Sequence, residues 1–236
     1  MSTPQPRAAL PEIVLARTVV SSDDSTSTVL SGAVEPQVTT SVVDVAAHTD
    51  VVYATREGTD GRDLQLRLDL MVPKTPGAKP LVVYLPGGGF VLSTKEAALA
   101  RRTYVAEAGY AVASVQYRTV ANGATYRDAV ADAKSAVRFL RAHGAQYGLD
   151  TSKVAIWGES AGGYLASADN VVPPSQSLLL HTALLEQGVE STRYVLTGAK
   201  HGDLSAMFGD PAAALGWSTE EILNHITDFL AKHLRS

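Results

Sequence analysis

From about residue 51 onward, the hydrophobic residues fall into two kinds of pattern. Some are short continuous apolar runs, which are typical of strands that are buried on both faces of a sheet. One earlier run alternates between apolar and polar residues, as a half-buried strand does. These patterns predict strands at residues 51–56, 64–72, 81–85, 110–117, 154–157 and 192–196.

The segments between the strands carry helical spacing and helix-capping residues. Apolar residues after Thr125 recur on one helical face, at Val130, Ala133, Val137 and Leu140. Three capping boxes pair Ser93 with Glu96, Thr125 with Asp128, and Ser218 with Glu221. We therefore expect helices at residues 93–108, from 125 through at least Leu140, from 161 onward, at 175–187 and from 218 onward.

This alternation of strands and helices predicts an α/β fold with a mostly parallel sheet flanked by helices on both faces. In such sheets the ligand site lies beyond the carboxyl ends of the strands. Residues 18–50 differ from the rest, because they contain no Lys or Arg and are rich in Ser, Thr and Val. We expect residues 1–50 to form an N-terminal arm that is loosely ordered or caps the site. Residues 51–236 would form the catalytic domain.

Composition removes several classes of function. The 20 Lys and Arg against 24 Asp and Glu give a net charge of −4, which provides no basic surface for nucleic acid. No apolar stretch approaches the roughly 18–20 residues of a membrane span. With no cysteine, thiolate zinc sites and cysteine nucleophiles are excluded. We see no secretory signal, which favours a cytoplasmic location.

The strongest chemical motif is Gly158-Glu159-Ser160-Ala161-Gly162, which fits G-x-S-x-G. It falls between a predicted strand and a predicted helix, the context in which a nucleophilic serine stands on a sharp turn. The alternative is a glycine-rich turn in which Ser160 only caps the helix.

A second motif, Pro86-Gly87-Gly88-Gly89, follows the predicted strand at residues 81–85. Consecutive glycines let backbone N–H groups approach a ligand closely and hold the oxyanion of a tetrahedral intermediate. We expect the oxyanion hole to use the N–H groups of Gly88, Gly89 and Ala161. The alternative is a plain loop, which the presence of both motifs disfavours.

With these motifs the sequence resembles the α/β-hydrolase fold, in particular the esterases and lipases with an HGGG oxyanion loop. The resemblance covers residues 79–165 and 169–229, with proline at position 86 where the family usually has histidine. It implies a triad of the nucleophile Ser160, the acid Asp169 in a D-x-x-V-P segment, and the base His201. It further implies a small-molecule ester substrate and neither cofactor nor metal. A lactone, amide or peptide hydrolase on the same fold is an alternative.

The interval between the nucleophile and the acid is unusually short. Nine positions separate Ser160 from Asp169, where the resembled family has a complete helix and further strands. On one continuous helix the two would stand ~13 Å apart, with the acid facing away from the site. Because the strands that the family has in this interval are missing, we expect a sheet with fewer strands than the family usually has.

Three explanations for the short interval stay open. Residues present in the molecule are absent from the sequence; or the chain is an internal deletion that is inactive; or the helix stops early and strand 192–196 docks beside strand 154–157. If the chain is an internal deletion, the alternative to an enzyme is a catalytically impaired homologue or a binding module that keeps the pocket. The oligomeric state is not predicted.

Overall fold

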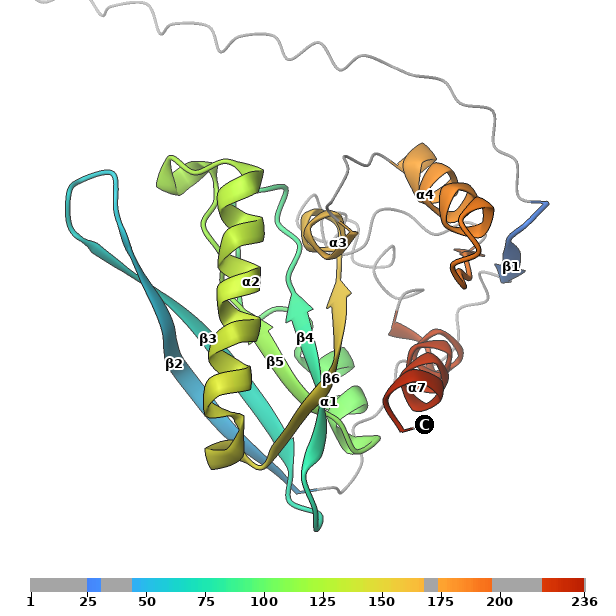
Figure 1. The fold of residues 1–236 in the computed structure, drawn as a ribbon, viewed down its shortest axis with the longest axis horizontal. Coiled ribbons are helices and arrows are strands. Elements are labelled where there is room, and N and C mark those ends of the chain that lie inside the picture. The colour runs from blue at the N-terminus through green and yellow to red at the C-terminus, as the bar shows by residue number, and fades with distance from the viewer. Residues whose placement is uncertain (1–24, 31–43, 168–173, 197–217, 236) are drawn as a thin grey trace, which may run out of the picture. The chain divides into compact units, whose positions relative to one another are not determined.

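The computed structural model describes residues 25–30, 44–167, 174–196 and 218–235 (Figure 1). The chain divides into two units. The smaller comprises residues 1–28 and 172–193, and the larger comprises residues 29–171 and 194–236. The larger unit holds the five-stranded sheet and the predicted motifs.

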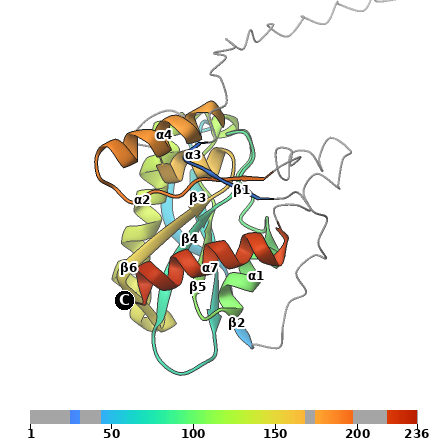
Figure 2. The ribbon, with the colours of Figure 1, turned by 90° about the vertical axis from the view of Figure 1, so that its right-hand side faces the viewer.

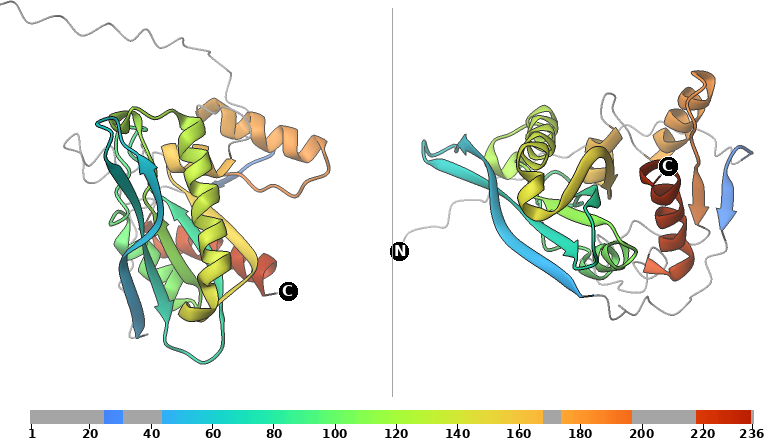
Figure 3. Two further views of the ribbon diagram at one scale, coloured as in Figure 1. Left: turned by 60° about the vertical axis from the view of Figure 1, so that its left-hand side comes forward. Right: turned by 60° about the horizontal axis from the view of Figure 1, so that its bottom comes forward.

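The sheet has the order β2-β3-β5-β4-β6. Strand β4 pairs in parallel with both β5 and β6, whereas β3 is antiparallel to β2 and to β5. Figure 3 shows the long β2–β3 hairpin at one edge of the sheet. The strands are β2 (Val45–Glu57), β3 (Asp63–Pro73), β4 (Lys79–Leu85), β5 (Ala111–Val115) and β6 (Leu149–Gly158). The five strands predicted from residues 51 to 157 are therefore confirmed, and β2 starts inside the segment predicted as an arm.

Alternate residues of the central strands supply two separate cores. In β4, Leu81, Val83 and Leu85 pack on one face, while Val82 and Tyr84 pack on the other. Helix α2 (Tyr126–His143) covers the first face (Figure 1), and helices α1 (Leu99–Glu107) and α7 (Glu220–Leu234) lie side by side over the second (Figure 2). The continuous apolar runs thus arise because both faces of these strands are covered.

Helix α2 confirms its predicted start. Thr125 and Asp128 form the capping box, in which the Asp128 carboxylate accepts from the Thr125 N–H at 2.8 Å. Ala133 and Leu140 of the predicted face are buried. Helix α7 is capped by Thr219, one residue later than the predicted Ser218. The Thr219 side chain accepts a hydrogen bond from the N–H of Ile222.

The helix predicted at residues 93–108 is wrong in its first turn, since α1 begins only at Leu99. The proposed capping residues have other partners. The Ser93 hydroxyl accepts from the N–H of Tyr117 at 2.9 Å, and the Glu96 carboxylate accepts from Lys95. The Lys95 ammonium also pairs with Asp69 at 3.0 Å. These contacts hold the segment away from helical geometry.

The third explanation for the short interval between Ser160 and Asp169 does not hold. Strand β7 (Tyr194–Leu196) does not dock beside β6; it pairs with β1 (Thr28–Leu30) in a separate two-stranded sheet. The N–H of Thr28 donates to the carbonyl of Arg193 at 2.9 Å. Since β1 lies in a segment without strand periodicity, its pairing was not visible in the sequence.

The smaller unit contains helix α4 (Pro174–Glu186), predicted at residues 175–187. Its His181 is buried and bonds through its two ring nitrogens to the Ser191 hydroxyl and the Thr26 carbonyl. This histidine therefore ties together segments of the smaller unit that are far apart in sequence.

A buried carboxylate joins three elements of the larger unit. Asp132, on α2, has a side chain that is 0% exposed. It accepts from Arg56 of β2 at 3.0 Å and from the side chain of Arg118, beyond β5, at 2.7 Å. The hydrogen bond to Asp132 raises the pKa of Arg118. Asp132 therefore fastens α2 to the sheet.

We predict that Asp132→Asn lowers the free energy of unfolding by about 3 kcal/mol, because removing one partner of a buried ion pair leaves the opposite charges uncompensated. Urea denaturation measures the change. Asp60→Asn is the matched control, because its pair with Arg62 is exposed and exposed pairs contribute little. Equal midpoints for the wild type and Asp132→Asn would contradict this prediction.

Candidate active site

The two predicted motifs meet because β4 and β6 are parallel neighbours. Leu85, the last residue of β4, is the Cα partner of Gly158, the last residue of β6. Residues 86–92, which we call the glycine loop, therefore leave the sheet beside the turn that contains Ser160. This is the carboxyl edge, where ligand sites of such sheets lie.

Ser160 stands on a sharp turn between β6 and helix α3 (Ala161–Ser167). It is exposed and adopts a φ of 50°, a left-handed conformation that is uncommon for a residue with a side chain. A Cβ added at Gly162 would collide with the carbonyl oxygen of Leu85. Glycine is therefore required there, and α3 can begin directly against the end of β4.

The glycine loop contacts the serine turn directly. A Cβ built on Gly87 would lie 3.3 Å from the Cβ of Ser160 and 3.2 Å from the carbonyl oxygen of Glu159. The carbonyl of Gly88 turns away and accepts from the N–H groups of Val91 and Leu92, each at 3.0 Å. The loop is thus folded on itself and seated against Ser160.

Residues 117–120, which we call the clamp segment, hold the glycine loop from the side of β5. The buried hydroxyl of Tyr117 donates to the carbonyl of Pro86 at 2.6 Å. The Thr119 hydroxyl donates to the carbonyl of Val91 at 3.0 Å, and the N–H of Val120 donates to Phe90 at 2.9 Å. Burial raises the pKa of Tyr117, so its phenol keeps the proton that it donates.

An ion pair supports the other side of the serine turn. The Arg101 guanidinium of α1 donates to the carboxylate of Glu159 at 2.9 Å, and the arginine side chain is only 7% exposed. The N–H of Glu159 donates to the carbonyl of Leu85 at 3.2 Å. Glu159 is thus engaged by both its backbone and its side chain immediately before Ser160.

The structure brings together four of the predicted site residues at one edge of the sheet: Ser160, Ala161, Gly88 and Gly89. Asp169 and His201 lie outside the described residues. Sequence reasoning missed the roles of Tyr117 and Arg101. The only signal for Tyr117 was a tyrosine at the end of a buried strand, and nothing near Arg101 in the sequence indicates its partner.

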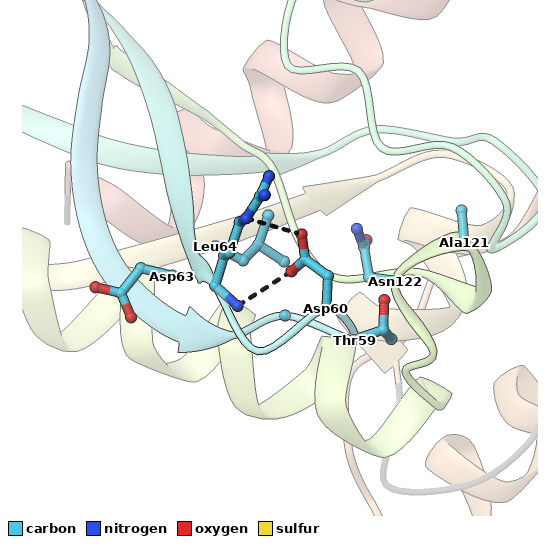
Figure 4. Close-up of a pocket in the computed structure, with 8 residues that line it drawn as sticks. Thr59, Asp60, Asp63, Leu64, Ala121 and Asn122 are labelled. Atoms are coloured by element: carbon cyan, nitrogen blue, oxygen red, sulfur yellow. Dashed lines mark hydrogen bonds and ion pairs between the residues drawn. The ribbon is translucent and has the colours of Figure 1, made fainter.

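A polar pocket lies elsewhere on this unit, at the tip of the β2–β3 hairpin (Figure 4). Its lining includes Thr59, Asp60 and Asn122, and no residue of the serine turn or the glycine loop contributes to it. Asp60 there accepts from the N–H of Arg62 at 3.1 Å. The pocket belongs to the hairpin rather than to the Ser160 site.

Two searches of the described part of the chain complete this survey. It contains no group of three or more His, Asp or Glu side chains that could hold a metal ion. None of its helices has both the length and the apolar character that crossing a membrane demands.

Several known proteins similar to this chain are named as esterases. Residues 68–168 match the BD-FAE family, a family of α/β-hydrolase esterases. A probable isoprenylcysteine alpha-carbonyl methylesterase of Oryza sativa subsp. japonica is 30% identical over 162 residues, 67% of this chain and 34% of that protein. The probable carboxylic ester hydrolase LipM of Mycobacterium tuberculosis is 30% identical over 131 residues, 55% of this chain and 30% of LipM. The chain spans about a third of the length of these curated relatives.

Solved structures agree with the topology. The propionate-bound esterase Est2 of Thermogutta terrifontis matches with a TM-score of 0.62 and 20% identity, covering 80% of this chain and 94% of Est2. In this fold the serine turn follows β6 and the glycine loop follows β4, so both lie at the carboxyl edge of the sheet. The chain therefore has the α/β-hydrolase fold, with a mixed, mostly parallel sheet flanked by helices.

Proposed function

We propose that this protein hydrolyses carboxylic esters through an acyl-enzyme formed on Ser160. The observation that carries the proposal is the exposed Ser160 in a left-handed conformation, with the glycine loop seated against it. The esterase names of the similar proteins support the same chemistry.

In the proposed mechanism, His201 accepts the proton of Ser160 as the serine oxygen attacks the ester carbonyl. Asp169 orients the imidazole and stabilises its charged form. The carbonyl becomes an oxyanion, which the N–H groups of Gly88, Gly89 and Ala161 stabilise. Collapse breaks the carbon–oxygen bond of the ester, and the alcohol leaves with the proton from His201. Water activated by His201 then releases the acid and restores Ser160.

The ion pair of Arg101 with Glu159 supports the nucleophile in this proposal. Glu159 is the residue directly before Ser160. Its side chain is held by Arg101 of α1, a helix that packs on the face of the sheet not covered by α2. Release of Glu159 would let the turn relax from its left-handed conformation. Displacement of a reacting group by about 1 Å can cost about a hundred-fold in rate.

Exposed apolar side chains of the glycine loop and the clamp segment suggest the kind of ester. Val91, Leu92 and Val120 are 53%, 48% and 57% exposed, and we call them the apolar rim. The backbone bond from Val120 to Phe90 places them around one loop. We place an apolar part of the substrate over this rim, where burial of each methylene contributes about 0.8 kcal/mol. The isoprenylcysteine methylesterase relative is named for an ester with an apolar group.

Replacement of the nucleophile tests the function. We expect Ser160→Ala to lower the hydrolysis rate of p-nitrophenyl butyrate by several powers of ten, because no acyl-enzyme can form. The wild type should also lose activity on labelling by an organophosphonate at Ser160. Ser152→Ala, at the other end of β6, is the matched control and should keep full activity. Equal rates for Ser160→Ala and the wild type would refute the proposal.

Removal of the supporting ion pair gives a second expectation. Arg101→Gln should lower kcat about ten-fold with little change in KM, because the turn loses its side-chain anchor rather than a substrate contact. Lys74→Gln is the control, since it breaks an exposed pair with Asp44 at the opposite edge of the sheet. Comparable losses in the two variants would show that charge removal in general, and not the anchor, lowers activity.

The apolar rim predicts a chain-length effect. We expect the wild type to have a lower KM for p-nitrophenyl hexanoate than for the acetate, since longer chains cover more of the rim. Leu92→Ser should raise KM for the hexanoate several-fold and leave the acetate unchanged. Phe229→Ser, a similarly exposed apolar position on α7, should change neither value. A uniform effect of Leu92→Ser on both esters would place the acyl group elsewhere.

A further inference from the structure

The glycine loop belongs to no helix or strand, and its internal backbone hydrogen bonds are the two that the Gly88 carbonyl accepts from Val91 and Leu92. It contains Gly88 and Gly89, with φ values of 143° and 60°, and Phe90, also with a φ of 60°. Three consecutive residues in left-handed backbone regions are costly for the chain to maintain unless surrounding contacts determine them. The two internal bonds begin only at Gly88, so the start of the loop depends on contacts from outside it.

The clamp segment provides those contacts at both ends of the loop. Tyr117 bonds to the carbonyl of Pro86, the residue immediately before the glycines, and its backbone N–H bonds to Ser93, just after the loop. Thr119 and Val120 bond to the carbonyls of Val91 and Phe90. One strand end thus fixes the entry, the turn and the exit of the glycine loop.

The bond of Tyr117 differs from those of Thr119 and Val120, because its hydroxyl bonds at the entry of the loop. Pro86 has no N–H to donate, so it cannot brace the loop through a backbone donor of its own. Its carbonyl is buried with the phenol, and a buried carbonyl that loses its donor is left unsatisfied. The adjacent Gly87 is the residue that contacts Ser160.

We propose that Tyr117 is a positioning residue for the oxyanion hole: through its hydroxyl on the carbonyl of Pro86, it sets the register of the glycine loop against Ser160. This inference rests on the proposed esterase function for its catalytic consequence. Tyr117 contacts neither substrate nor nucleophile in this role. Its effect falls on the transition state, because the oxyanion forms only as the ester carbonyl is attacked.

The chain offers a matched control for this phenol. Tyr53 is also buried, and its hydroxyl donates to the backbone carbonyl of Gln116 at 2.5 Å. Gln116 is the neighbour of Tyr117, yet the bond contacts the strand end and not the glycine loop. Tyr117→Phe and Tyr53→Phe therefore each remove one hydroxyl from one buried tyrosine–carbonyl bond. Only the first removal touches the loop.

The catalytic test compares kcat and KM for p-nitrophenyl butyrate, and the rate at which an organophosphonate labels Ser160. We expect Tyr117→Phe to lower kcat and the labelling rate about ten-fold to a hundred-fold, with KM nearly unchanged. Tyr53→Phe should retain wild-type rates although its urea midpoint falls comparably. Wild-type rates in Tyr117→Phe, or equal losses in both variants, would overturn the inference.

A second readout does not depend on activity. Hydrogen exchange of the backbone N–H groups of Gly87, Gly88 and Gly89 should accelerate in Tyr117→Phe and not in Tyr53→Phe. Unchanged exchange in the loop would overturn the positioning role whatever the catalytic rates. Accelerated exchange in Tyr117→Phe, combined with a wild-type protein whose Ser160 is not labelled by the organophosphonate, would support the positioning contact and refute the proposed function.

Discussion

The parallel pairing of β4 with β6 is the constraint on which the rest of the site depends. It aligns Leu85 with Gly158 and so ends both strands at one point. The carbonyl of Leu85 then accepts from the N–H of Glu159, and Gly162 packs against the same carbonyl. Because a Cβ at position 162 would collide with that carbonyl, backbone contact lets α3 begin directly against the end of β4.

Around this backbone contact, a helix on one face of the sheet and the end of a neighbouring strand provide separate supports. Helix α1 lies on the same face of the sheet as α7. Its Arg101 forms an ion pair with Glu159, the residue before Ser160. β5 continues into the clamp segment, which holds the glycine loop. Three adjacent parallel strands, β5, β4 and β6, thus deliver the clamp, the glycine loop and the nucleophile in that order.

The ion pairs of the larger unit are similarly placed between elements. Asp132 links α2 to β2 through Arg56 and to the clamp segment through Arg118, which directly follows Tyr117. Lys95 links the segment after the glycine loop to Asp69 of β3. The irregular backbone at the site is therefore anchored by charged groups on both sides, where regular secondary structure provides no hydrogen bonds.

Much of this architecture can be predicted from short stretches of the sequence. The strands, the capping box at Thr125 and the two glycine motifs follow from runs and spacings of a few residues, because burial on both faces and sharp turns each demand particular neighbouring residues. The same local rules failed at Ser93 and Glu96. That capping box is correct in pattern, but tertiary partners compete for both side chains.

The sequence by itself thus determined which serine and which glycines the fold would present, and on which strands. Only the tertiary structure decided what holds them. The partners of Pro86, Glu159 and Asp132 lie 31, 58 and 76 residues away in the chain. No periodicity or motif encodes such pairs, because a hydrogen bond between distant residues depends on the strand order and on the faces that the helices cover, which are properties of the folded chain.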